Sequence, residues 1–159
     1  MRVLLKLALL VVVMVIMFGA GFVVSLGVGE AVDPASLSER ERSFTEQMRD
    51  VVLVGHFTIE GRESADGNPE RYEIESVTKV GENRWQFKTR LTYGNVDVTL
   101  PLTMPLLWAG DTPIVSITDF SIPSLGTFTS RVMFYDDRYA GSWQHGEYGG
   151  LMYGTITKR

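Results

Sequence analysis

The stretch RWQFKTRLTYGNVDVTLPLTM, residues 84–104, decides the fold class of this chain. Apolar and aromatic residues alternate with polar ones on both sides of Gly94-Asn95, a two-residue sequence typical of a tight β-hairpin turn. Because the alternation has a period of two, each arm presents one apolar face and one polar face. The pattern predicts two antiparallel strands, with Pro101 and Pro105 marking an edge of the sheet or an exit from it.

The same period continues in both directions from this hairpin. Short alternating runs, separated by turn residues, lie at 51–61, 71–80, 84–93, 96–104, 114–122, 127–135, 138–144 and 150–158. Short links between neighbours favour antiparallel pairing in chain order, and eight such strands close most economically into an up-and-down barrel. We therefore expect residues 51–159 to form an all-β domain, an antiparallel barrel of about eight strands, with a two-sheet sandwich as the alternative.

Residues 31–50 are predicted to be a linker that contains a short amphipathic helix. Ser36 with Glu39, or Ser38 with Glu41, has the spacing of a capping box. A narrow apolar stripe runs along one helical face through Leu37, Phe44, Met48 and Val51. The other faces carry charges of both signs, which favours a stripe that caps the following domain over a membrane-surface or coiled-coil helix.

Residues 1–30 are predicted to be a transmembrane signal-anchor or a signal peptide. The 23 residues from Leu7 to Gly29 contain no ionisable side chain, and this length favours an uncleaved membrane anchor. Residues 7–18, followed by the small residues 19–21, fit a cleaved signal. Basic residues precede the run and acidic residues follow it, so the positive-inside rule places the domain outside the cytoplasm. We expect an inner-membrane anchor with a periplasmic domain, or a free periplasmic protein after cleavage.

The composition argues against several functional classes. The chain has 159 residues, 19 acidic against 15 basic residues, two histidines and no cysteine. A net charge of −4 argues against a nucleic-acid partner, and the lack of cysteine excludes disulfides, thiolate metal sites and cysteine nucleophiles. The sequence contains no nucleophile elbow, phosphate loop, dinucleotide fingerprint or His-Glu-x-x-His motif. We therefore expect no enzyme activity, no catalytic residues, no cofactor and no metal site.

Four stretches of the domain carry a resemblance to a known family: DVTLP at 97–101, WAGDTP at 108–113, GTFTSRV at 126–132 and YAGSWQHGEYGG at 139–150. They resemble a family of uncharacterised bacterial proteins in which a signal or anchor segment precedes one small β-domain. The rhythm of short hairpins with Gly-x-Trp and Gly-x-Phe steps is also similar to calycin-type barrels, such as those of lipocalins and avidin. The resemblance implies an exported location and a β-barrel architecture, and it implies no chemistry.

Aromatic residues and glycines gather in two stretches, 108–113 and 145–150, which we expect at the rims of the barrel. The candidate ligand-binding residues are Trp85, Trp108, Asp111, Tyr139, Trp143, His145 and Tyr153. Tryptophan and tyrosine supply apolar area with a polar group, whereas Gly-Asp-Thr-Pro around Asp111 has the composition of a turn. Further hydroxyl groups share faces with apolar residues at Ser76, Thr78, Thr89, Ser116 and Thr118.

Two functions follow from this sequence. The first is a membrane-anchored extracytoplasmic barrel that binds a small apolar or amphipathic molecule. The alternative is a structural or interaction domain with a solid core that contacts another envelope protein. A cavity of a few hundred Å³ inside the barrel separates the first function from the second.

Overall fold

A computed structural model describes residues 29–62, 67–122 and 125–159. The predicted anchor or signal segment lies almost entirely in residues 1–28, outside the described residues. Among the described helices, none has the length and apolar character needed to cross a membrane.

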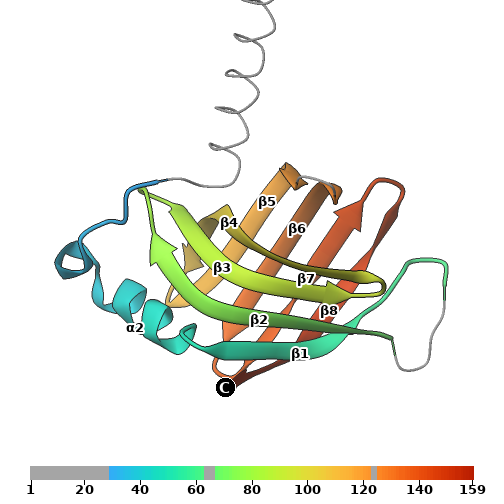
Figure 1. The fold of residues 1–159 in the computed structure, drawn as a ribbon, viewed down its shortest axis with the longest axis horizontal. Helices are drawn as coiled ribbons and strands as arrows, with labels where there is room; N and C mark the ends of the chain where they lie inside the picture. Colours follow the sequence, from blue (N-terminus) through green and yellow to red (C-terminus); the bar gives the residue numbers. More distant parts are fainter. Residues whose placement is uncertain (1–28, 63–66, 123–124) are drawn as a thin grey trace, which may run out of the picture.

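The domain is a closed antiparallel barrel in which the strands follow chain order from β1 to β8 (Figure 1). Strand β1 pairs with β2 on one side and with β8 on the other, where Val51 lies opposite Lys158 and Phe57 opposite Met152. The prediction of an eight-stranded up-and-down barrel is confirmed, and the sandwich alternative is wrong. The strands are β1 (Val51–Phe57), β2 (Asn68–Lys79), β3 (Arg84–Tyr93), β4 (Val96–Ala109), β5 (Thr112–Ile122), β6 (Gly126–Tyr135), β7 (Arg138–His145) and β8 (Tyr148–Lys158).

One end of the barrel is plugged by helix α2 (Glu39–Gln47), which follows a short 3-10 turn, η1 (Pro34–Ser36). The backbone N–H of Ser38 donates to Glu41 Oε2 over 2.9 Å, which closes the predicted capping box. The predicted stripe points into the barrel, where Phe44 is 2% exposed and Met48 0%. The Phe44 ring lies 5.8 Å from the ring of Trp85 and 6.0 Å from that of Trp108. The helix therefore forms the floor of the barrel rather than a separate linker.

The two ends of the barrel differ because α2 covers only one of them. At the plugged end β1 begins, β8 ends and the β4–β5 turn lies beside α2, where Arg40 Nη1 donates to Gly110 O over 3.1 Å. At the other end lie the β3–β4, β5–β6 and β7–β8 connections, together with the chain that follows β1. The two stretches expected at the rims, 108–113 and 145–150, lie at opposite ends.

Strand β4 pairs with its two neighbours over very different lengths. It pairs with β3 from Val96 to Pro105, but with β5 only through the four pairs from Leu106↔Val115 to Ala109↔Thr112, which we call the β4–β5 seam. Pro101 and Pro105 lie outside this seam, in the part of β4 that has β3 alone as its partner. The edge character predicted for these prolines is confirmed, because proline has no N–H to donate to a second neighbour.

Two irregularities shift the predicted faces of the strands. A break in the β2–β3 register between Ile74 and Ser76 moves Val77 to the inside, and Ser76 pairs with the outward-facing Lys88. A second break between Ile117 and Phe120 includes Asp119, with a φ of 50°. One extra residue turns every later side chain to the opposite face. Four of the five hydroxyl residues therefore do not share the inner face, and Thr89 alone of these points inward and is buried.

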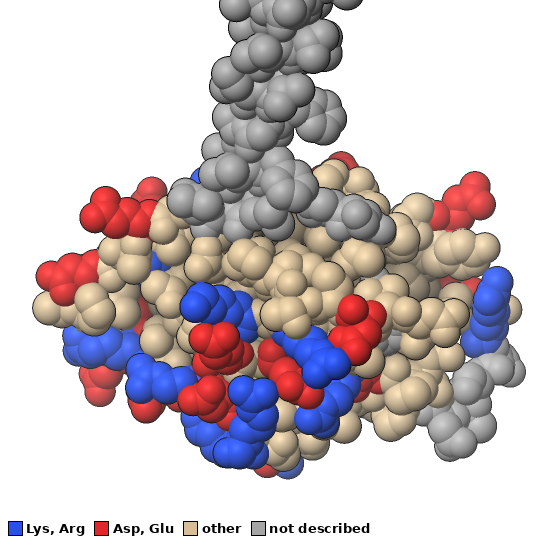
Figure 2. All heavy atoms as spheres, viewed as in Figure 1, with Lys and Arg blue, Asp and Glu red and all other residues tan. Residues whose placement is uncertain are grey.

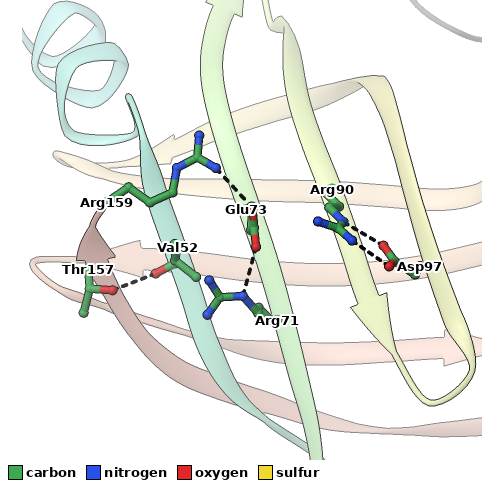
Figure 3. Close-up of polar contacts among 7 residues, drawn as sticks. All are labelled: Val52, Arg71, Glu73, Arg90, Asp97, Thr157 and Arg159. Carbon is green, nitrogen blue, oxygen red and sulfur yellow. Dashed lines mark hydrogen bonds and ion pairs between the residues drawn. The ribbon is translucent and has the colours of Figure 1, made fainter.

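The outer face of β1–β4 is polar, and charges of both signs are interspersed over it (Figure 2). Arg90 donates to both carboxylate oxygens of Asp97 over 2.7 Å each, and Glu73 accepts from Arg71 and Arg159 over 3.1 Å each (Figure 3). These pairs are solvent-exposed or half-exposed, so each contributes little to stability. These charged side chains make this face of the sheet hydrophilic, as expected for a surface that contacts solvent.

Candidate functional site

The barrel encloses a cavity of about 570 Å³. Its wall comes from all eight strands, and most of the lining side chains are apolar. Side chains near the unplugged end, among them Ile59, Leu125 and Tyr148, also line it, so the cavity extends toward that end. A volume of this size lies within the usual range of small-molecule sites.

A buried carboxyl group lies in the wall of this apolar cavity. Glu70, on β2, is 4% exposed. Tyr139 Oη donates to its Oε1 over 2.8 Å, and Tyr72 Oη donates to its Oε2 over 2.6 Å. Burial raises the pKa of Glu70 above its ordinary value, while the two phenol hydrogen bonds and the charge of His56 act in the opposite direction. Burial, and then the neighbouring Glu70, also raise the pKa of Tyr139, so its hydroxyl keeps its proton.

Two glycines allow Tyr139 to reach Glu70 across the barrel wall. The strand registers place Glu70, Gly55, Gly154 and Tyr139 opposite one another in a row across β2, β1, β8 and β7. A Cβ atom on Gly55 would lie 2.4 Å from Tyr139 Oη, and one on Gly154 would lie 2.7 Å from Tyr139 Cε1. The tyrosine ring therefore lies over the two glycines, where any larger residue would clash with it.

Two further polar atoms in the cavity wall lack partners. Thr89 Oγ1 and Trp143 Nε1 are buried, and neither has a hydrogen-bond partner among the described residues. Both residues line the same cavity as Glu70. An unpartnered buried polar group is costly, so the wall presents a hydroxyl and an indole N–H to whatever occupies the cavity.

Two cationic or titratable side chains, together with aromatic rings, line the cavity near the unplugged end. The ring of His145 stacks on Phe128 with centroids 4.4 Å apart, and the guanidinium of Arg62 lies 5.4 Å from the ring centre of Tyr148. Arg62, His145 and Tyr148 are exposed. We call this group the mouth of the cavity.

The structure separates the seven candidate ligand-binding residues into three groups. Tyr139, Trp143 and His145 line the cavity. Trp85 and Trp108 pack around Phe44 at the floor, and Asp111 is exposed in the turn beyond them, as the turn composition around it predicts. Tyr153 is exposed, on the strand face opposite that of Met152, which lines the cavity. Whether any of these residues binds a ligand stays a prediction.

The sequence reasoning missed Glu70, the polar centre of the cavity. Glu70 lies just outside the predicted strand at 71–80, and glutamate is rarely buried, so nothing in its immediate neighbourhood indicated a place in the core. The available signal was positional: Glu70, Tyr72 and Ile74 occupy alternate positions and therefore share one face of the strand. A glutamate in phase with two apolar or aromatic residues indicates an inward carboxyl group.

Comparisons with known proteins give no relative from which a function could be transferred. No protein-family model matches the chain, and neither the curated proteins nor the solved structures contain a significant match. The resemblance to exported β-domain proteins and to calycin-type barrels stays an expectation. Among the described residues, no group of three or more His, Cys, Asp or Glu side chains is placed to hold a metal ion.

Proposed function

We propose that this protein is a membrane-anchored extracytoplasmic barrel that binds one small apolar or amphipathic molecule in its cavity. The observation that carries the proposal is the apolar cavity of about 570 Å³ with the Glu70 carboxyl group in its wall. Eight-stranded barrels have interiors that side chains fill or that hold one small ligand. Here the glycine pair and the plug at one end leave a site that is closed below and lined by a few polar groups.

Ligand binding is tested by filling the cavity. The full chain in an amphipol should bind an environment-sensitive apolar dye saturably, at about one dye per chain. Ser130→Trp should abolish this binding, because Ser130 lines the cavity and an indole would occupy the space. Ser142→Trp is the matched control, since Ser142 is exposed on the neighbouring strand and its substitution leaves the cavity unchanged. Equal dye binding by both variants would show partition into the amphipol and would contradict the proposal.

Membrane anchoring is supported by the apolar run at 7–29 and by the basic residues Arg2 and Lys6 before it. An alkaline phosphatase fusion after residue 50 should be active and should sediment with membranes. A fusion after Lys6, which lacks the apolar run, is the control and should be inactive. Activity confined to the soluble periplasmic fraction would show that the segment is cleaved, and an inactive residue-50 fusion would overturn the extracytoplasmic location.

An exposed apolar stripe on the outer surface favours the interaction domain as a second candidate function. The strand registers place Leu107 opposite Ile114, Ile114 opposite Met133, and Met133 opposite Ala140, which in turn faces Tyr153. Leu107, Met133 and Tyr153 are all exposed large hydrophobic residues. The dye experiment separates the two candidates, because a domain that acts only through this stripe needs no cavity binding.

A further inference from the structure

The chemistry of the cavity wall restricts the polar group that its occupant carries. The polar partners of Glu70 are the hydroxyls of Tyr72 and Tyr139, and among the described residues no Lys, Arg or His forms an ion pair with it. The charge of His56 on β1 acts on it at longer range and lowers its pKa, without a hydrogen bond or ion pair between the two side chains. The other polar atoms of the inner wall, on Thr89, Ser130 and Trp143, are uncharged.

A carboxylate in such a place is incompletely satisfied. Each carboxylate oxygen has two acceptor positions, and each oxygen of Glu70 uses one of them for a tyrosine hydroxyl. A buried charge without an opposite charge carries a large desolvation penalty, which an ion pair with good geometry offsets. No charged donor among the described residues fills the remaining acceptor positions, so a cationic hydrogen-bond donor in the cavity would complete the ionised group.

We propose that the cavity takes a cationic amphiphile, whose protonated amine contacts the Glu70 carboxylate while its hydrocarbon part lies against the apolar wall. This inference rests on the proposed ligand-binding function. A carboxylate amphiphile in the same orientation would bring a second negative charge to Glu70, which is unfavourable at short range. Its remaining binding mode would place the carboxylate at the mouth, beside Arg62 and His145.

Three octyl compounds of equal chain length test the head group: octylamine, octanol and octanoate, each displacing the apolar dye from the full chain in amphipol. Octylamine should bind about tenfold or more tightly than octanoate, since its ammonium group donates a hydrogen bond to the Glu70 carboxylate and octanoate is repelled by it. Glu70→Gln should weaken the binding of octylamine by about the same factor and should change the affinity for octanol by less than about threefold. Each compound partitions into the amphipol equally with the unmodified chain and with Glu70→Gln. A change in the ratio of octylamine to octanol affinity therefore reports the contact between the amine and Glu70.

Two further variants make the result specific to the charge of Glu70. Glu75→Gln removes an exposed carboxylate from the same strand, outside the cavity, and should leave the octylamine-to-octanol ratio unchanged. Glu70→Asp keeps the charge and should retain a preference for octylamine even if Glu70→Gln folds poorly. The ratio should also rise with pH through the raised pKa of Glu70, because octylamine stays protonated while the carboxyl group, which faces the hydroxyls of Tyr72 and Tyr139 and lies in the field of His56, becomes charged.

The outcomes separate this inference from the function on which it rests. Tighter binding of octanoate than of octylamine, or an unchanged ratio in Glu70→Gln, would overturn the cationic head group. Displacement of the dye by none of the three compounds would also overturn it, while the dye-binding function would stand. Absence of saturable dye binding in the unmodified chain would instead overturn the proposed function itself.

Discussion

Phe44→Ala is expected to lower the free energy of unfolding by about 3–5 kcal/mol, which is the usual cost of truncating a buried phenylalanine. Phe44 is the centre of the floor, and its ring lies within 6.4 Å of four other rings, those of Trp85, Phe87, Trp108 and Phe134. Removing it leaves a void that these large rings cannot fill without leaving their packed positions. Denaturant unfolding followed by tryptophan fluorescence measures the loss.

Ser43→Ala is the matched control for Phe44→Ala. Ser43 precedes Phe44 on α2 but is exposed, so its truncation should change the free energy of unfolding by less than about 0.5 kcal/mol. A loss below about 1 kcal/mol for Phe44→Ala would contradict the plug. It would mean that the barrel is stable without α2 and that the helix rests on it only loosely.

Gly154→Ala is expected to cost about 3 kcal/mol, at the upper end of the range for overpacked positions. The new Cβ would lie 2.3 Å from Val54 O and 2.7 Å from both Gly55 Cα and Tyr139 Cε1. Two of these neighbours are backbone atoms of the paired strand β1, so the β1–β8 ladder must separate or shift. The tyrosine ring must also move, which weakens its hydrogen bond to Glu70.

Gly81→Ala serves as the control for this substitution. Gly81 lies in the β2–β3 turn, and the nearest atom to its Cβ would be Arg84 Cβ at an ordinary 3.4 Å. It should change the free energy of unfolding by less than about 0.5 kcal/mol. If Gly154→Ala lowers the free energy of unfolding as little as Gly81→Ala does, Tyr139 does not lie over Gly154. The arrangement in which Tyr139 reaches Glu70 across the two glycines would then be wrong.

The barrel was predictable because its signals are local. The period of two residues, the Gly94-Asn95 turn and the stripe of Phe44 and Met48 are each visible in a few consecutive residues. The irregularities after Ile74 and Ile117 were not predictable, because a bulge adds a residue without changing composition. Strict alternation, counted through the two bulges, therefore predicts the wrong face for Ser76 and Thr118.

The site was less predictable than the fold, for a physical reason. Whether a tryptophan fills a cavity or lines it depends on which end of the barrel is plugged, and that is a tertiary property of α2. Trp108 and Trp143 both lie in strands within three residues of an Ala-Gly pair, yet one packs on Phe44 and the other faces the cavity. Glu70 was missed because its burial depends on two hydroxyl donors, one of which is 69 residues away in the chain.

The β4–β5 seam is the shortest ladder in the barrel. It joins its two strands through four residue pairs, from Leu106 to Ala109 on β4, whereas each of the other ladders has seven or more. Because the seam lies at the plugged end, the parts of β4 and β5 nearer the other end each have one paired neighbour, β3 and β6 respectively. The wall of the cavity is therefore least constrained by backbone hydrogen bonds between β4 and β5.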